Sequence, residues 1–339
     1  MTAPVDLRSD TVTRPTAAMR RAMADAEVGD DIYGEDPTAR RLEAEVAEIL
    51  GQEAALFVPS GTMGNQLALL LHCRPGDDVV VGEEAHVVLY ESGAAAALAG
   101  VQHTVAGRGG TFGARDLEAA LFPTSAYYQP RSRLVVVENT HNRAGGLVWP
   151  PELIAEVLGA ARQHGLATHL DGARLWNAAV ASGRPEADLA RGFDTVSVCF
   201  SKGLGAPVGS ALAGSVALIT EARRRRKMLG GAMRQVGILC AGALHALRHH
   251  RSALVEDHRR ARRLAEALAE VATVNLASVQ TNLVYATVPD APGVAERAAA
   301  AGVLVGAMGP TTLRAVAHRD VGDAGVDRAI RVLREACGG

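Results

Sequence analysis

The stretch Phe193–Gly209, which reads FDTVSVCFSKGLGAPVG, sets the fold class of this 339-residue chain. Its first half is an apolar run of strand length, and its second half is a glycine-rich turn, with Lys202 at the junction. Open α/β sheets bind their ligands just beyond the carboxyl ends of their strands. The stretch therefore predicts a buried strand that presents the Lys202 amine at the ligand-binding edge of a sheet.

Around this stretch, short apolar runs alternate with helical patterns from about residue 54 to residue 213. The expected strands are Ala54–Val58, Asp78–Val81, Val101–Val105, Leu134–Glu138, Leu166–Leu170, Thr195–Phe200 and Ser210–Ala213. The expected helices between them include Gly64–His72, Ala114–Phe122, Pro151–His164 and Leu175–Ser182. Near-continuously apolar strands separated by single helices are typical of parallel sheets covered on both faces. The pattern predicts an α/β fold with a mostly parallel, seven-stranded sheet.

The pattern changes after about Gly230. Long helical patterns at Met233–His250 and Arg251–Ala272 come first. Shorter segments follow, with strands expected at Thr281–Thr287, Val303–Gly306 and Thr312–Ala317 and a helix at Asp323–Ala336. We expect a large domain over residues 1–250, including the N-terminal segment, and a small α+β domain over residues 251–339.

Composition excludes several classes of protein. The formal net charge is only -2, which gives no support for binding nucleic acid or anionic lipid. No apolar run approaches the roughly 18 residues of a membrane helix, and Met1–Pro15 lacks the apolar core of a signal peptide. The four cysteines form no CxxC pair, so neither a disulfide framework nor a zinc site is expected. These features favour a soluble cytoplasmic protein without a metal centre.

Only two of the 35 basic residues are lysines, Lys202 and Lys227. Chemistry that needs a side-chain amine therefore has two candidates, since an arginine guanidinium stays protonated. Lys227 ends the basic run that begins at Arg223, which is more typical of a solvated helix face or a subunit contact than of a nucleic-acid patch. Lys202 follows an apolar run, and in a dry pocket its pKa would fall so that the amine can attack an aldehyde. The alternative is a surface lysine in a loop.

Asp171 ends a second apolar run, 31 residues before Lys202. That separation accommodates one helix and the next strand, so both side chains can leave the carboxyl ends of strands in one sheet. A carboxylate there can keep the pyridine nitrogen of pyridoxal phosphate protonated, which makes the ring an electron sink. The alternative for Asp171 alone is a cap of the following helix.

Two further motifs follow strand ends. Ser60–Asn65 lies between an expected strand and helix, where glycines and free N–H groups suit a phosphate, although a plain N-cap turn is the alternative. His86 comes shortly after the strand at Asp78–Val81, where its ring could stack on a pyridine; a structural histidine is the alternative.

With these motifs in order, the chain resembles the low-specificity L-threonine aldolases, a family of fold type I (aspartate aminotransferase-like) pyridoxal-phosphate enzymes. The resemblance covers nearly the whole chain. The segments that carry it are Asp6–Pro15, Gly29–Gly34, Ser60–Asn65, Glu138–Asn142, Asp171–Arg174, Ser201–Gly205, Arg226–Met228 and Gly230–Gln235.

The resemblance implies a role for each of several residues. Lys202 would hold the cofactor as a Schiff base, Asp171 would pair with the pyridine nitrogen, and His86 would stack on the ring. Gly61 and Thr62, together with Arg234 of a neighbouring subunit, would bind the cofactor phosphate. Ser9, Arg174 and Arg314 would bind the substrate carboxylate. Arg174 would also border the cofactor. Members of the family are typically homotetramers with shared active sites.

Tyr128 marks a departure from the family pattern. It stands where many relatives have a histidine near the substrate hydroxyl, so we expect Tyr128 to contact the substrate.

The resemblance implies cleavage of L-threonine or L-allo-threonine to glycine and an aldehyde, with His86 as the candidate base for the β-hydroxyl. Two alternatives are a β-eliminating lyase on the same scaffold and a non-catalytic protein that binds pyridoxal phosphate.

Overall fold

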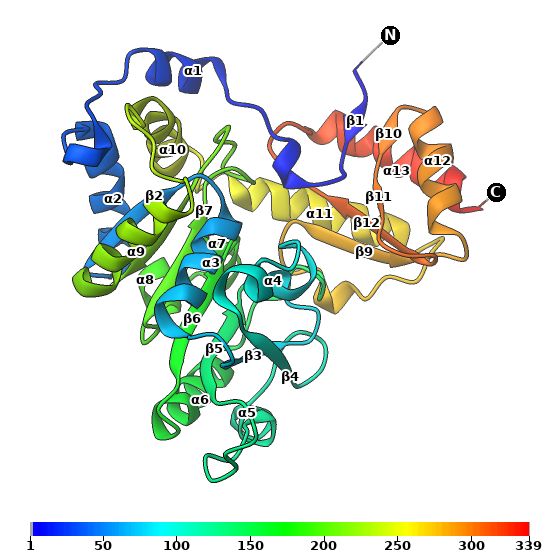
Figure 1. The fold of residues 1–339 in the computed structure, drawn as a ribbon. Coiled ribbons are helices and arrows are strands. Elements are labelled where there is room, and N and C mark those ends of the chain that lie inside the picture. The colour runs from blue at the N-terminus through cyan, green and yellow to red at the C-terminus, as the bar shows by residue number, and fades with distance from the viewer. Residues whose placement is uncertain (1–2, 339) are drawn as a thin grey trace.

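The structure is a computed structural model that describes residues 3–338. A seven-stranded sheet forms its larger part (Figure 1). The strands are β2 (Ala54–Val58), β3 (Asp78–Gly82), β4 (Gln102–Ala106), β5 (Ser132–Glu138), β6 (Ala167–Gly172), β7 (Thr195–Cys199) and β8 (Ser210–Gly214). They lie in the order β2-β8-β7-β6-β5-β3-β4, and only β8 runs antiparallel to its neighbours. The expected α/β fold with a mostly parallel sheet is confirmed.

Two separate cores explain why these strands are almost entirely apolar. Successive side chains of a strand point to opposite faces of the sheet. Val80 therefore packs into one core, whereas Val79 and Val81 pack into another on the opposite face. Because both faces are buried, these strands have no alternating polar positions. The near-continuous apolar runs in the sequence reflect this burial.

Helices cover both faces of this sheet (Figure 1). They are α2 (Pro37–Leu50), α3 (Gly61–His72), α4 (His86–Leu89), α5 (Ala114–Ala120), α6 (Pro151–Gln163), α7 (Leu175–Ser182), α8 (Glu186–Ala190), α9 (Val216–Met228) and α10 (Gly237–His249). The short α1 (Ala17–Ala24) packs on α10. None of the helices within residues 3–338 is long and apolar enough to cross a membrane.

The C-terminal part has its own core and its own sheet. This sheet is antiparallel and three-stranded, with the order β11 (Gly306–Ala307), β12 (Thr312–Val316) and β9 (Leu283–Thr287). The helices α11 (Leu254–Leu268), α12 (Ala291–Ala300) and α13 (Asp323–Gly338) pack around them. This is the expected small α+β unit.

The N-terminal segment differs from expectation. Strand β1 (Val5–Asp6) pairs in parallel with β10 (Val303–Leu304), and Leu7 is fully buried in the C-terminal core. We had expected the N-terminal segment to belong to the large domain, but residues 5–7 pack with the C-terminal unit. The reason is that Leu7 buries its side chain there and that, within residues 3–338, β1 pairs with β10 alone. The division at residues 250 and 251 itself stays a prediction.

Candidate active site

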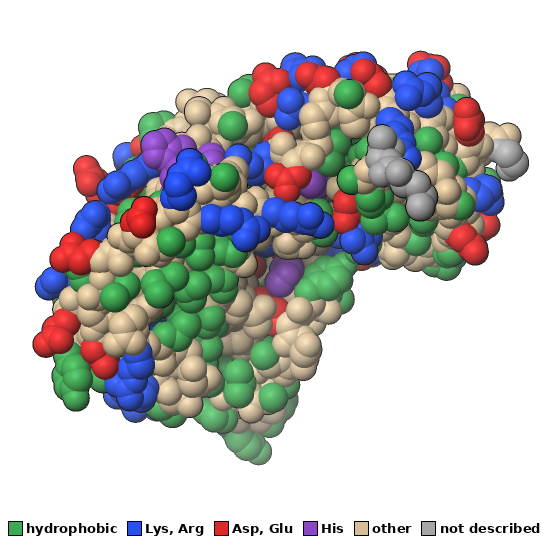
Figure 2. Space-filling view, turned by 90° about the horizontal axis from the view of Figure 1, so that it is seen from above, with side chains coloured by type: hydrophobic (Ala, Val, Ile, Leu, Met, Phe, Trp, Pro, Cys, Tyr) green, Lys and Arg blue, Asp and Glu red, His purple; other side chains and the backbone are tan. Residues whose placement is uncertain are grey.

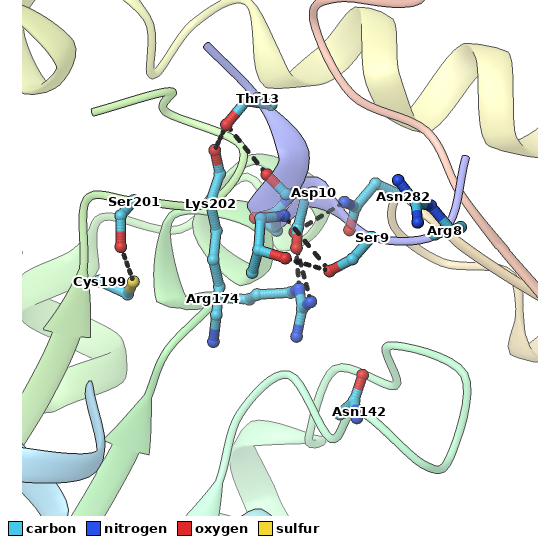
Figure 3. A network of polar contacts seen from close by, with 12 residues as sticks. Arg8, Ser9, Asp10, Thr13, Asn142, Arg174, Cys199, Ser201, Lys202 and Asn282 are labelled. Carbon is cyan, nitrogen blue, oxygen red and sulfur yellow. Dashed lines mark hydrogen bonds and ion pairs between the residues drawn. The ribbon is translucent and has the colours of Figure 1, made fainter. Parts of the chain in front are cut away.

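Lys202 lies where the sequence predicted, just beyond the carboxyl end of β7. Its backbone carbonyl accepts hydrogen bonds from Thr13 Oγ1 and from the Gly205 N–H, both at 2.8 Å. Gly205 has a φ of +79°, a conformation that glycine adopts without strain, so the chain can turn sharply there. The half-buried Lys202 side chain extends away from this turn, past Arg174 (Figure 3).

Asp171 is the penultimate residue of β6, the strand that neighbours β7, and is 2% exposed. Its Oδ1 accepts from the Ala173 N–H at 3.1 Å, and its Oδ2 accepts from Asn65 Nδ2 at 2.8 Å. Burial alone would raise the pKa of Asp171, but the neighbouring His86, Lys202 and His169 outweigh burial and lower it. The structure therefore keeps a carboxylate, rather than a carboxylic acid, at this edge of the sheet.

His86 begins α4, after β3, and forms a pair with Glu91. The ring Nδ1 lies 3.0 Å from Glu91 Oε1, and the His86 backbone N–H donates to Glu138 Oε2 at 2.7 Å. Burial would lower the pKa of His86, but the hydrogen bond to Glu91 and the nearby charge of Asp171 raise it overall. Because the Glu91 carboxylate accepts from Nδ1, the other ring nitrogen, Nε2, is left to face a ligand.

One imidazole and two carboxylates thus form a tight cluster. The closest ligand-type atoms of His86, Glu91 and Asp171 all lie within 4.8 Å of one another. Glu91 Oε1 accepts from Asn65 and His86, while its Oε2 accepts from Gln66 Nε2 at 2.7 Å. N–H donors already face these oxygens, which favours a hydrogen-bonded network here over a metal centre.

The N-terminus of α3 could hold a phosphate. Ser60 caps the helix by accepting from the Met63 N–H, and the first intrahelical bond runs from the Gly64 N–H to the Ser60 carbonyl. The N–H groups of Gly61 and Thr62 precede that bond and point out of the helix. The buried hydroxyl of Ser210 has no partner within the described residues and lies 3.7 Å from where a Cβ on Gly61 would be. Free donors and an orphaned hydroxyl fit an anion.

Arg174 and Arg314 come from different parts of the chain, and both contact the N-terminal segment. Arg174 donates from Nε and Nη2 to the two carboxylate oxygens of Asp10, at 2.8 and 2.7 Å (Figure 3). This fork leaves Arg174 Nη1 to bind a ligand. Arg314 Nη2 donates to the Arg8 carbonyl at 3.0 Å, and its Nη1 lies 3.5 Å from Asn142 Oδ1.

Ser9 caps a 3₁₀ turn at Asp10–Val12, where its hydroxyl accepts from the Thr11 N–H at 3.2 Å. Figure 3 draws Ser9 beside Asp10 and Arg174. The structure thus brings Ser9 and Arg174 together, and Arg314 contacts the same N-terminal segment through Arg8.

Two residues from the sequence prediction do not join this cluster within one chain. Tyr128 is 77% exposed and precedes the amino end of β5, the edge of the sheet opposite to Asp171. Within one protomer Tyr128 therefore lies away from the other candidate site residues, and its contact with the substrate stays a prediction. The Arg234 side chain is 58% exposed and lies 3.4 Å from Asp30.

Asp10, Asn65 and Glu91 are the residues that sequence reasoning missed. Asp10 lies inside the quoted motif Asp6–Pro15, and Glu91 follows His86 by five residues, but nothing local indicates the partner of either side chain. Asp10 and Asn65 make contacts between segments that lie far apart in the sequence, and the contact of Glu91 with His86 spans five residues without forming a recognisable motif.

The arrangement fits pyridoxal phosphate. A lysine amine, a buried carboxylate, an imidazole and a helix N-terminus match the aldehyde, the pyridine nitrogen, the ring face and the phosphate of that cofactor. Arg174, which lies beside Lys202 (Figure 3), and Arg314 suit a carboxylate, because a guanidinium can bind it through two hydrogen bonds.

Comparisons with known proteins show the family of this chain. Residues 6–291 match the family model of the beta-eliminating lyases. The chain is 48% identical over 334 residues to probable low-specificity L-threonine aldolase 2 of Arabidopsis thaliana, covering 95% of this chain and 94% of that protein. It is 42% identical to the low specificity L-threonine aldolase of Escherichia coli K12, covering 94% of each chain.

Solved structures show the same fold. The threonine aldolase of Leishmania major superposes with a TM-score of 0.83 at 22% identity, covering 98% of this chain and 99% of that one. A putative L-allo-threonine aldolase of Listeria monocytogenes gives 0.81 at 20% identity, covering 98% and 96%. With its family model, its relatives and its fold in agreement, this chain belongs to the low-specificity L-threonine aldolases, within the beta-eliminating lyase family.

Proposed function

We propose that this protein is a pyridoxal-phosphate-dependent carbon–carbon lyase that cleaves L-threonine, L-allo-threonine and related β-hydroxy-α-amino acids to glycine and an aldehyde. The observation that carries the proposal is the convergence of Lys202, Asp171 and His86 at the carboxyl edge of one sheet. Membership of the threonine aldolase family supports the reaction class.

The residues that would hold the cofactor each have one task. The Lys202 amine would hold the aldehyde carbon, Asp171 would hold a proton on the pyridine nitrogen, and the Gly61 and Thr62 N–H groups would hold the phosphate. When bound, pyridoxal phosphate supplies an electron sink for the pair released as the Cα–Cβ bond breaks. The negative charge of Asp171 would favour a protonated ring nitrogen, which is the form that accepts electrons best.

The remaining residues would bind and orient the substrate. Arg174, Arg314 and Ser9 would hold the α-carboxylate, and charge-assisted bonds of this kind contribute about 1.5–3 kcal/mol each. His86 would take the proton of the β-hydroxyl at Nε2. Glu91 fixes the imidazole with Nδ1–H pointing away from the substrate, so the basic nitrogen faces the hydroxyl.

A homotetramer with shared active sites, in the cytoplasm, completes the proposal. The exposed positions of Arg234 and Tyr128 support sharing, because both side chains lie at the protein surface, where a neighbouring copy can contact them. Large apolar side chains are also exposed on segments close to the site, among them Ile32, Tyr33, Leu89, Tyr90 and Met228. Burying such side chains between subunits would stabilise an oligomer.

Product analysis tests the proposed reaction. Purified protein loaded with pyridoxal phosphate is incubated in parallel with L-threonine, L-allo-threonine and phenylserine. We expect glycine together with acetaldehyde or benzaldehyde in equal amounts. Release of ammonia and a keto acid instead would identify a β-eliminating lyase, the reaction class after which the matching family model is named. A protein that binds the cofactor but releases neither set of products would be a non-catalytic binder.

A further inference from the structure

The amide of Asn65 lies between two buried carboxylates. Its Nδ2 is 2.8 Å from Asp171 Oδ2 and 2.8 Å from Glu91 Oε1, so the two amide hydrogens serve one carboxylate each. Asn65 is 2% exposed, as are Asp171 and Glu91. Asn65 is thus the group that joins the carboxylate expected at the pyridine nitrogen to the carboxylate that holds His86.

The orientation of this amide is fixed from behind. Asn65 Oδ1 accepts from the Ser197 hydroxyl at 2.9 Å and lies 3.1 Å from His169 Nε2. A carbonyl oxygen can only accept, so His169 must carry its proton on Nε2. Burial lowers the pKa of His169 to about 4, so the ring is neutral near pH 7 and carries that single proton.

The proton positions of Thr195 and His72 follow from that of His169. His169 Nδ1 lies 2.9 Å from the Thr195 hydroxyl and 3.2 Å from the Thr195 backbone carbonyl. Because the single ring proton is on Nε2, Nδ1 accepts from the hydroxyl, and the carbonyl contact is not a hydrogen bond. That hydroxyl in turn lies 3.1 Å from Nε2 of the partly buried His72, which must donate to it. The side-chain hydrogen bonds that link His72, Thr195, His169, Ser197 and Asn65 then all run toward the two carboxylates.

We propose that Asn65, oriented by Ser197 and His169, is a positioning residue that holds Asp171 and Glu91 in place as ionised carboxylates and thereby couples the cofactor ring to the His86–Glu91 pair. The inference rests on the proposed function, since it assigns Asp171 to the cofactor. A flipped amide would direct Oδ1 at two carboxylates, and Ser197 and His169 prevent that flip because each supplies a donor to Oδ1. The other charged or titratable groups that face Asp171 are His86, Lys202 and His169.

Cofactor binding by matched variants tests this role. In Asn65→Leu, Asp171 and Glu91 each lose a donor at a buried charge, and we expect pyridoxal phosphate to bind about 10- to 100-fold more weakly. Gln66→Leu is the control, because Gln66 donates only to Glu91 and not to Asp171. Its affinity for the cofactor should stay within about threefold of the unmodified protein. Dissociation constants are measured from the absorbance of the bound cofactor.

Two variants of His169 separate positioning from folding. His169→Gln keeps an N–H donor for Asn65 Oδ1, whereas His169→Leu removes it. We expect Gln to preserve cofactor affinity and Leu to weaken it, although His169 makes no hydrogen bond to Asp171 or Glu91. The ¹⁵N NMR signals of cofactor-free protein should also identify His169 as the Nε2–H tautomer.

The outcomes distinguish the inference from the proposed function. Unmodified protein that takes up no pyridoxal phosphate would overturn the proposed function. Normal uptake by unmodified protein, together with unchanged affinity in Asn65→Leu and in His169→Leu, would overturn only the inference. A His169 signal of the Nδ1–H tautomer would also overturn it, because the direction of the hydrogen bonds would then be wrong.

Discussion

Asp10 and Arg174 form a buried ion pair at the edge of the candidate site, and neither is more than 6% exposed. Asn282 Nδ2 adds a third donor to Asp10, at 3.1 Å. Burial would raise the pKa of Asp10, but Arg174, Lys202 and Asn282 together hold it well below its usual range. Asp10 therefore acts through Arg174, because it orients the Arg174 guanidinium toward the position expected for the substrate carboxylate.

The first prediction concerns this pair. Asp10→Asn leaves the Arg174 charge buried without a counter-charge, which typically costs about 3–5 kcal/mol of unfolding free energy. Asp6→Asn is the control, since it breaks an exposed pair with Arg8 and should cost less than about 1 kcal/mol. Denaturant unfolding at pH 7 measures both variants.

The pH dependence of the Asp10 effect has a definite sign. A carboxyl group with a lowered pKa stabilises the fold above its unfolded pKa of about 4, and that contribution is lost as the pH falls below this value. The difference between Asp10→Asn and the unmodified protein should therefore be full at pH 7 and shrink below about pH 4. A difference that stays constant down to pH 3 would mean that the ion pair is not its cause.

The second prediction concerns the base. Glu91 raises the pKa of His86, so Glu91→Gln should lower it. A base works only when unprotonated, so the acidic limb of the kcat/KM profile for threonine cleavage should move to lower pH. A limb that does not move in Glu91→Gln would assign the proton transfer to another group.

Residues at strand ends could be predicted from the sequence, and their partners could not. Lys202, Asp171 and His86 each follow an apolar run, and in a parallel sheet such positions share one edge. Asn65 ends the Ser60–Asn65 motif, but its partners Ser197 and His169 lie more than 100 residues away in the sequence. A hydrogen bond over that separation leaves no local pattern in the sequence.

At the scale of elements, helix α11 carries a buried charge without a full set of partners. Asp257 is 2% exposed, its Oδ1 has no hydrogen bond within the described residues, and Arg260 Nη1 lies 3.7 Å away. Burial raises the pKa of Asp257 to about 7, although Arg260 opposes the shift. The helix therefore includes a group that prefers to be protonated in the folded state.

The third prediction follows from that preference. A raised carboxyl pKa lowers stability as the pH rises from about 4 to 7, because the unfolded chain releases the proton more readily than the folded chain. Asp257→Asn removes this penalty and should stabilise the protein at pH 8 by up to about 4 kcal/mol, at about 1.4 kcal/mol per pKa unit. The gain should be small near pH 4. Glu256→Gln, on the exposed face of the same helix, is the control. Equal effects of Asp257→Asn at pH 4 and pH 8 would contradict this reading.

The elements themselves were predicted well because their two cores leave a strong signal. All seven strands of the large sheet lie within a few residues of their expected positions. The antiparallel direction of strand β8 could not be predicted from the sequence, because direction does not alter which residues are buried. Pairing of Val5–Asp6 with β10 was missed for a similar reason, because two residues are too short for any periodicity.

At the scale of the molecule, the N-terminal segment connects the two cores. Leu7 is buried in the C-terminal core, whereas Thr13 donates to the Lys202 carbonyl beside the large sheet. Figure 2 shows a recess between the two parts, with apolar side chains gathered on the neighbouring surface of the larger part. An exposed apolar surface beside a recess is consistent with the proposed contact between subunits.

The fourth prediction tests sharing of the site. Lys202→Ala and Arg234→Ala chains should each be nearly inactive, but mixed oligomers should regain up to about a quarter of the activity, since some sites then combine intact residues from two subunits. Mixing Lys202→Ala with Asp171→Ala is the control. Those two residues lie in one chain's sheet, so no intact site can form. Activity in the control mixture, or none in the first mixture despite exchange of subunits, would contradict sharing through Arg234.

The central claim is that the Lys202 amine is the covalent attachment point of the cofactor. Protein loaded with pyridoxal phosphate is reduced with borohydride, digested and mapped by mass spectrometry; Lys227 is the internal control, because it is the only other lysine. The account predicts one pyridoxyl group per chain on Lys202, no label in Lys202→Ala and full labelling of Lys202 in Lys227→Ala. A label on Lys227, or a stable label in Lys202→Ala, would contradict it.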